Sequence, residues 1–148
     1  MTDLIPVVVA GALGRMGAEV IRAVQGAEDC TLVGAIDNTP GKEGCDVGLE
    51  LGLGELEVAV TADFEGCLCA VSQSVRDAEA GAVLVDFTHP SVVYDHTRAS
   101  IAYGVHPVIG TTGLSPQQLD DLTQFSAKAS IGGAVIPNFS VGMVLLQQ

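Results

Sequence analysis

The chain has 148 residues, of which 48% are hydrophobic and 16% charged, and its formal net charge is −12. It is too apolar to be disordered, and it is long enough for one domain whose core needs no disulfide or metal. The acidic balance argues against nucleic acid or an anionic membrane as main partner, because both require a basic face. The apolar run over 4–13 lacks a basic flank and is too short to cross a bilayer, so we expect a cytoplasmic protein.

The first 37 residues predict a β-α-β unit. Residues 5–10 are apolar and β-branched, which is typical of a strand buried on both faces. Apolar residues recur at helical spacing over 18–24, and a second buried strand over 31–36 ends at Asp37. The lengths of the connections between them are normal for such a unit.

The glycine-rich residues 38–55 predict an irregular, mobile loop of the kind that is usually functional or disordered. We expect Thr88 to cap one of the later helices, and Ser115-Pro-Gln-Gln118 has the pattern of a capping box before another. Beyond the loop, we expect strands at 57–60, 82–86, 105–109 and 133–136, and helices around 67–72 and over 90–102, 116–129 and 140–148.

This alternation predicts an α/β fold: a Rossmann-like, doubly wound parallel sheet in three layers, α/β/α. We expect a dinucleotide-binding domain over 1–137 and, over 138–148, a hinge and the start of a helix. Apolar side chains continue to Leu145 and Leu146. We therefore interpret that helix as leading to a second domain that is absent from this sequence.

A glycine motif follows the first strand and begins the first helix. Gly11-Ala-Leu-Gly14-Arg-Met-Gly17 is a G-x-x-G-x-x-G variant of the dinucleotide fingerprint. Gly11 would allow the tight turn, Gly14 the close approach of a pyrophosphate, and Gly17 the packing of the helix on the sheet. The helix N-terminus would offer N–H groups to the phosphates, with Arg15 and Met16 at the mouth of the turn.

An acidic residue ends the second strand, where a carboxylate accepts hydrogen bonds from the adenosine ribose. This residue, Asp37, lies 20 positions beyond Gly17. It favours NADH, because a carboxylate repels the 2′-phosphate of NADPH. Asn38 and Lys42 follow closely and are compatible with NADPH, so both cofactors remain candidates.

Two further loops follow expected strands, at the strand ends where such folds bind ligands. They are Asp86-Phe87-Thr88-His89 and Gly110-Thr111-Thr112-Gly113. Their hydroxyl and backbone groups suit ribose or a carboxamide. A third segment, Pro137-Asn138-Phe139-Ser-Val-Gly142, follows the last expected strand.

These four motifs, in this order and spacing, resemble the 4-hydroxy-tetrahydrodipicolinate reductase family (formerly dihydrodipicolinate reductase). Its members are pyridine-nucleotide reductases of the diaminopimelate route to lysine. The resemblance covers essentially the whole chain and points to the family's N-terminal cofactor domain. It implies hydride transfer from NADH or NADPH to a small-molecule substrate by the full-length enzyme. It also implies a homotetramer built by the second domain, so we expect this chain alone to be a monomer.

The resemblance implies a role for each loop. The glycine loop should contact the pyrophosphate and Asp37 the ribose, while Phe87 and Thr88 line the cleft with His89 near its adenosine end. The loop from Gly110 should hold the nicotinamide carboxamide, and residues 137–139 should close over it. The resulting cofactor-binding candidates are Gly11, Gly14, Arg15, Met16, Gly17, Asp37, Asn38, Phe87, Thr88, His89, Gly110, Thr111, Thr112, Pro137, Asn138 and Phe139.

The sequence lacks the residues with which the family performs its chemistry. The family's substrate domain carries a His-His pair with a Lys and a Ser-Gly-Thr loop for the substrate carboxylates, and neither occurs here. The three histidines, His89, His96 and His106, are isolated, and we interpret the last two as structural. We therefore expect no catalytic residue in this chain, which should bind cofactor without turnover.

The four cysteines form no C-x-x-C pair and predict free thiols rather than a metal site. Two other functions stay open. One is a stand-alone nucleotide-sensing domain without catalysis. The other is the cofactor domain of a homoserine or aspartate-semialdehyde dehydrogenase, which the Gly-Thr-Thr-Gly and Asn-Phe-Ser-Val-Gly segments disfavour.

Overall fold

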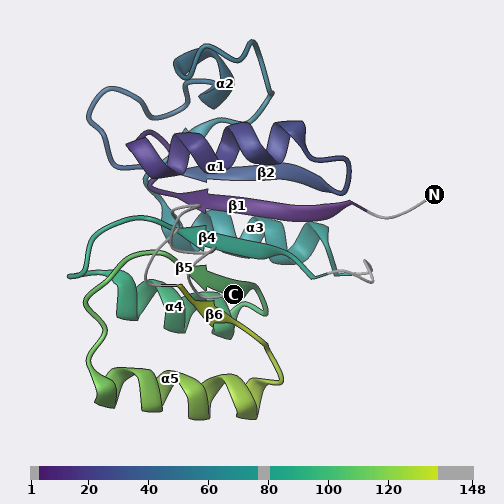
Figure 1. The fold of residues 1–148 in the computed structure, drawn as a ribbon. Coiled ribbons are helices and arrows are strands. Elements are labelled where there is room, and N and C mark those ends of the chain that lie inside the picture. Colours follow the sequence, from purple (N-terminus) through teal and green to yellow (C-terminus); the bar gives the residue numbers. More distant parts are fainter. Residues whose placement is uncertain (1–3, 77–80, 137–148) are drawn as a thin grey trace, which may run out of the picture.

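The computed structural model describes residues 4–76 and 81–136. Within them, six parallel strands form one sheet in the order β3-β2-β1-β4-β5-β6 (Figure 1). The strands are β1 (Ile5–Ala10), β2 (Cys30–Ile36), β3 (Val60–Thr61), β4 (Val83–Asp86), β5 (His106–Ile109) and β6 (Ala134–Val135). The helices are α1 (Arg15–Gly26), α2 (Val47–Glu50), α3 (Phe64–Ser74), α4 (Val93–Ala102) and α5 (Pro116–Ala129).

This strand order is that of a doubly wound sheet, so the predicted Rossmann-like α/β fold is confirmed. The chain runs outward from β1 to β3 and then returns to β4, which pairs with the other side of β1. The loops after β1 and β4 therefore diverge at a topological switch point, where open α/β sheets bind their ligands.

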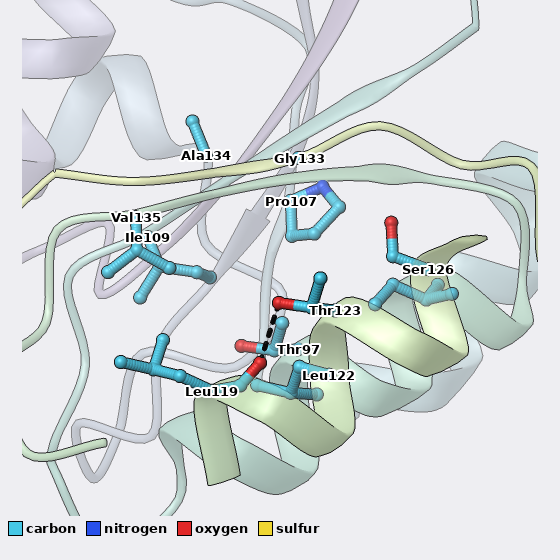
Figure 2. A pocket seen from close by; sticks show the side chains of 11 residues that line it. Thr97, Pro107, Ile109, Leu119, Leu122, Thr123, Ser126, Gly133, Ala134 and Val135 are labelled. Carbon is cyan, nitrogen blue, oxygen red and sulfur yellow. Dashed lines mark hydrogen bonds between the residues drawn. The ribbon is translucent and has the colours of Figure 1, made fainter. Parts of the chain in front are cut away.

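A cavity lies between one edge of the sheet and the helices that pack on it. It has a volume of about 260 Å³ and lies between α4, α5 and the strands β5 and β6. Figure 2 shows Pro107 and Ile109 of β5 facing Leu119 and Leu122 of α5 across it. Among its lining residues is also Val135 of β6, which is 46% exposed.

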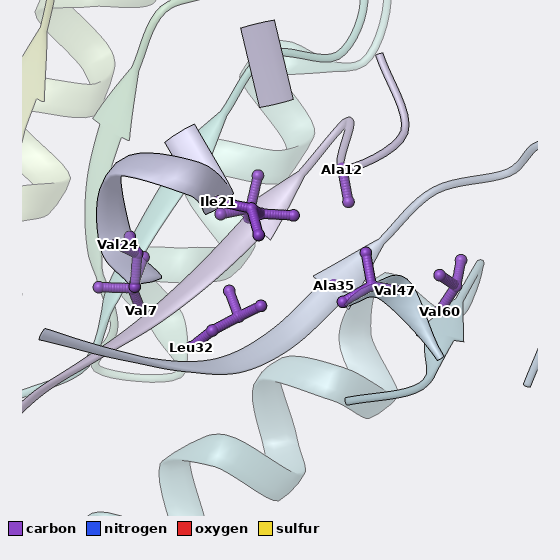
Figure 3. Packing of buried hydrophobic residues seen from close by; sticks show 9 residues of the cluster. Val7, Ala12, Ile21, Val24, Leu32, Ala35, Val47 and Val60 are labelled. Carbon is purple, nitrogen blue, oxygen red and sulfur yellow. The ribbon is translucent and has the colours of Figure 1, made fainter. Parts of the chain in front are cut away.

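The centre of the sheet is packed on both faces, as the apolar run over 5–10 predicts. Val7 and Val9 join Ile21 and Val24 of α1 in one buried cluster (Figure 3). Alternate residues of β1 point the other way, where Val8 joins a second cluster that includes side chains of α3. Each fully buried aliphatic side chain contributes about 1.5–3 kcal/mol to folding, so the packing of β1 on both faces anchors the start of the glycine loop that follows it.

The loop over 38–55 is not irregular throughout, so that prediction is wrong at the loop's centre. The loop contains the single turn of α2 and an isolated antiparallel bridge between Asp46 and Ala59. The Asp46 carboxylate accepts hydrogen bonds from the backbone N–H groups of Leu49, Leu56 and Val58 at 3.0–3.3 Å. These bonds, that from Leu56 first, hold the pKa of Asp46 below its usual value.

The expected cap of α4 is also wrong. Thr88 does not cap this helix, which begins at Val93 with Val92 as a cap that makes no side-chain hydrogen bond. The residues between form a turn in which the Val92 N–H donates to the His89 carbonyl. The Thr88 hydroxyl instead donates to Asp86 at 2.5 Å.

Other predicted elements agree in type and differ in extent. The capping box before α5 is confirmed, because Ser115 and Gln118 exchange hydrogen bonds between side chain and backbone. The strand expected at 57–60 is the two-residue β3, and the helix expected around 67–72 is the longer α3. The hinge and helix expected over 138–148 lie outside the described residues. Within the described ranges, no helix is long and apolar enough to cross a membrane.

Candidate functional site

A second, larger cavity of about 550 Å³ opens at the carboxyl ends of β1, β2 and β4. Its lining includes seven of the residues that the sequence singled out: Gly11, Gly14, Asp37, Asn38, Phe87, Thr88 and His89. It also includes residues that the sequence did not indicate: Ile36, Ala62, Phe64, Ser91, Val92 and His96. The predicted ligand loops after β1, β2 and β4 therefore meet at one site.

The glycine loop has no room for side chains at two of its three glycines. Gly11 has a φ of +82°, and a Cβ atom there would lie 2.5 Å from the carbonyl oxygen of Phe87. A Cβ at Gly17 would lie 1.9 Å from the carbonyl oxygen of Gly11. Gly17 therefore lets α1 pack against the turn itself, where the sequence predicted packing on the sheet.

Gly14 has a different environment. A Cβ there would lie 3.3 Å from the Gly11 carbonyl oxygen, a tight contact that a shift of a few tenths of an ångström would relieve, so the position is much less crowded than Gly11 or Gly17. Gly14 is also the N-cap of α1, and the helix has neither a side-chain cap nor an acidic residue in its first turn. The first N–H groups of a helix lack partners within the helix, so this terminus is suited to an anion. Arg15 and Met16 are exposed at this terminus and lie outside the cavity lining.

Asp37 supports the glycine loop as well as lining the cavity. Its Oδ2 accepts a hydrogen bond from the Leu13 N–H at 2.9 Å, and its Oδ1 accepts from the N–H and hydroxyl of Thr39. Nearby, the Lys42 ammonium lies 2.8 Å from the Glu50 carboxylate, which raises the pKa of Lys42. Lys42 is therefore already paired, while Asn38 is exposed at the cavity.

The loops after β4 and β5 lie side by side. The Gly110 N–H donates to the Asp86 carbonyl at 2.9 Å, and a Cβ at Gly110 would lie 2.3 Å from the Phe87 ring. The Phe87 ring thus packs directly on the backbone of Gly110. Thr112 is exposed beyond it, whereas Thr111 is buried and turns its hydroxyl toward Asp86.

Asp86 begins the motif Asp86-Phe87-Thr88-His89, and the sequence predicted no role for it. It has no exposed surface, and its carboxylate accepts hydrogen bonds from Thr88, His96 and Thr111. An acidic residue at the end of a buried strand, followed two positions later by Thr, is the signal that points to it.

The three histidines differ in their surroundings. His89 Nδ1 lies 2.9 Å from the Ser91 hydroxyl at the cavity. His96 Nδ1 lies 3.0 Å from Asp86, and its ring stacks on Phe64 with 3.9 Å between the ring centroids. His106, in β5, lies 2.9 Å from the Gly132 carbonyl and away from the cavity. The remaining candidates, Pro137, Asn138 and Phe139, lie outside the described residues.

A sequence model of the family "Dihydrodipicolinate reductase, N-terminus" matches residues 5–139. The chain belongs to this family. The assignment agrees with the resemblance seen in the four motifs and decides against the homoserine and aspartate-semialdehyde dehydrogenase alternatives. Within the described residues, no group of His, Cys, Asp and Glu side chains is placed to hold a metal ion.

Similar proteins are named 4-hydroxy-tetrahydrodipicolinate reductase. A 4-hydroxy-tetrahydrodipicolinate reductase of Synechococcus sp. (strain CC9605) is 90% identical over 148 residues, which are all of this chain and 53% of that protein. One from Cyanothece sp. (strain PCC 7425 / ATCC 29141) is 56% identical and matches 97% of this chain. The chain spans about half the length of the curated relatives that it matches.

Solved structures agree with the fold. A dipicolinate-bound dihydrodipicolinate reductase from Paenisporosarcina sp. TG-14 superposes with a TM-score of 0.72 and 29% identity, over 97% of this chain and 51% of that one. The WlbA dehydrogenase from Thermus thermophilus, in complex with NAD and UDP-GlcNAcA, gives the same TM-score at 15% identity, over 90% of this chain and 41% of that one. At that identity the second likeness shows the fold alone.

Proposed function

We propose that this chain is the dinucleotide-binding part of a 4-hydroxy-tetrahydrodipicolinate reductase. It holds NADH or NADPH in the larger cavity, and the full-length protein transfers hydride to the substrate named in its relatives. Residues 1–137 form the cofactor domain, and 138–148 lead toward the part that contacts the substrate. The homotetramer and the cytoplasmic location expected from the family belong to the same proposal.

One observation carries the proposal. The uncapped N-terminus of α1 follows a turn that only glycine fits, and both lie beside a half-buried carboxylate at the end of β2. The helix end favours the pyrophosphate through its N–H groups and its dipole. The space at Gly14 allows the phosphates to approach the backbone closely, and Asp37 stands where an adenosine ribose offers its hydroxyls.

The residues of this chain bind and orient; hydride chemistry is supplied by the nicotinamide ring when the cofactor is bound. Phe64 and Phe87 give the cavity apolar walls, while Thr88 and His89 add polar groups. The loop at Gly110 and Thr112 is the candidate contact for the carboxamide. Proton donation and substrate binding are assigned to residues beyond this chain, so the chain alone should bind without turnover.

Calorimetric titration of the chain with NADH and, separately, with NADPH tests the proposal. We expect binding with a micromolar dissociation constant for at least one of them. NADH should bind more tightly, because Asp37 repels a 2′-phosphate and Lys42 is paired with Glu50. If neither cofactor binds at millimolar concentration, the proposed function is wrong for this chain.

A further inference from the structure

Asp86 is an acidic side chain in a place where an apolar one would be expected. It ends β4 with no exposed surface, beside the buried strand residues Leu84 and Ile109. Burying a carboxylate is costly unless hydrogen bonds replace those that it makes with water. A buried carboxylate with a basic partner is often no more stabilising than apolar side chains of the same volume. The carboxylate of Asp86 is therefore better explained by the groups with which it forms hydrogen bonds than by a gain in stability.

Those groups come from three segments of the chain: the loop after β4, helix α4 and the loop after β5. Asp86 Oδ1 accepts from the N–H and hydroxyl of Thr88, at 2.9 and 2.5 Å, in the loop after β4. Oδ2 lies 3.0 Å from His96 Nδ1 on α4. The Thr111 hydroxyl, in the loop after β5, lies 3.3 Å from Oδ1 and 3.2 Å from the Asp86 carbonyl.

Two of these partners reach the cavity and one does not. Thr88 and His96 are among its lining residues, and His96 stacks on Phe64, which lines it too. Thr111 is buried, lies outside the lining and directs its hydroxyl into the protein. Its neighbours in the chain, Gly110 and Thr112, are more exposed, so Thr111 is the inward-facing member of its loop.

We propose that Asp86 and Thr111 are positioning residues for the cofactor, an inference that rests on the proposed function. The buried carboxylate joins the wall of the cavity to the loop after β5 and fixes the distance between them. The hydroxyl of Thr111 is the link on the β5 side. Thr111, one of the expected cofactor contacts, thus acts through Asp86 and leaves contact with the nicotinamide half to Gly110 and Thr112.

This arrangement makes a prediction that a purely structural role does not. ADP-ribose contains the adenosine, pyrophosphate and second ribose of the cofactor and lacks the nicotinamide. Loosening the loop after β5 should weaken binding of NADH and leave binding of ADP-ribose nearly unchanged. General loss of structure would weaken both ligands together.

The test is calorimetric titration of the 148-residue chain and its variants with NADH and with ADP-ribose. Thr111→Val keeps the shape and removes only the hydroxyl; it should weaken NADH about tenfold and ADP-ribose less than twofold. Thr111→Ser restores the hydroxyl and should recover the wild-type ratio. Asp86→Ala removes the carboxylate that Thr88, His96 and Thr111 contact, and it should shift the ratio in the same direction as Thr111→Val.

Thr97→Val is the matched control. Thr97 is buried on α4 beside His96, and its hydroxyl donates to the Val93 carbonyl of its own helix, at 2.7 Å. Its removal should leave the ratio unchanged. Equal weakening of both ligands by Thr111→Val, or no weakening of either, overturns the positioning role while the proposed function stands. Failure of the unaltered chain to bind either ligand overturns both proposals.

Discussion

The two sides of the larger cavity are held in place by different means. On the β1 side, the glycine loop is fixed by backbone contacts so close that Gly11 and Gly17 have no room for a Cβ atom. On the β4 side, the loop is fixed by the side chain of a buried carboxylate, Asp86. The first side depends on the absence of side chains and the second on one side chain with several partners.

The two sides are therefore sensitive to different kinds of substitution. An added atom at Gly11 or Gly17 disturbs the glycine loop, because the neighbours there are backbone atoms that cannot easily move aside. The β4 side depends in addition on hydrogen bonding, since the partners of Asp86 are the hydroxyl groups of Thr88 and Thr111 and the imidazole of His96. Three substitutions test the β1 side, and a fourth tests a carboxylate outside the cavity.

Gly17→Ala has the largest expected effect. Its Cβ would lie 1.9 Å from the Gly11 carbonyl oxygen, so the turn or the helix must shift. We expect a loss of roughly 1–3 kcal/mol in the free energy of unfolding, together with loss of NADH binding. Gly26→Ala, at the other end of the same helix with nothing within 4 Å, is the control and should leave both unchanged or slightly improved. Urea denaturation measures the stability of the two variants, and calorimetry measures their NADH affinity. Equal stability of Gly17→Ala and Gly26→Ala would contradict the close packing at Gly17.

Gly14→Val separates binding from folding. A Cβ at this position would lie 3.3 Å from the Gly11 carbonyl oxygen, a much milder contact than at Gly17, and the side chain would occupy the approach of the pyrophosphate. We expect a change in the free energy of unfolding below about 1 kcal/mol and a loss of NADH affinity of more than about 100-fold, or 2.7 kcal/mol. Unchanged affinity in calorimetry would remove the glycine loop from the binding site.

Asp37→Ala tests the carboxylate on the β1 side of the cavity. It removes an acceptor for the ribose and a support of the glycine loop, and it also removes the repulsion of a 2′-phosphate. We expect NADH affinity to fall about tenfold, near 1.4 kcal/mol, and NADPH affinity to fall less. A larger loss for NADPH than for NADH in parallel titrations would mean that Asp37 is not the ribose ligand.

Asp46→Asn has the smallest expected effect and concerns a carboxylate outside the cavity. Because hydrogen bonds lower the pKa of Asp46 in the folded chain, its contribution to stability is present above its unfolded pKa of about 3.9 and is lost as the pH falls through the folded pKa. The variant should therefore be less stable than the wild type at pH 7, and the difference should narrow toward pH 3. Denaturation curves at pH 7 and pH 3 measure the difference in free energy of unfolding between the two proteins. A difference that grows in acid would contradict this role of Asp46.

The sequence predicted best what depends on neighbours in the chain. The three glycines, the strand before them and the helix after them lie within about 22 residues, and the structure places them as expected. The alternation of strands and helices was sufficient for the sheet, because parallel strands require crossovers. The capping box before α5 is local in the same sense.

What the sequence missed depends on residues far apart in the chain. His96 and Thr111 lie 10 and 25 positions beyond Asp86, and no local pattern predicts that they meet there. Thr88 before Pro90 has the local signature of a helix cap, but the carboxylate of Asp86 competes for the same hydroxyl. In the loop over 38–55, Asp46 reaches the Leu56 N–H across 10 positions, which a scan for turns does not anticipate.

Mapping of backbone amide chemical shifts during titration with NADH tests the central claim most directly. If the larger cavity binds the cofactor, amide shifts should change on both of its sides, in the glycine loop from Gly11 to Gly17 and at Thr88. Residues around the smaller cavity, such as Leu122 and Gly133, should remain unchanged. Shifts confined to the smaller cavity, with the glycine loop unaffected, would contradict the account.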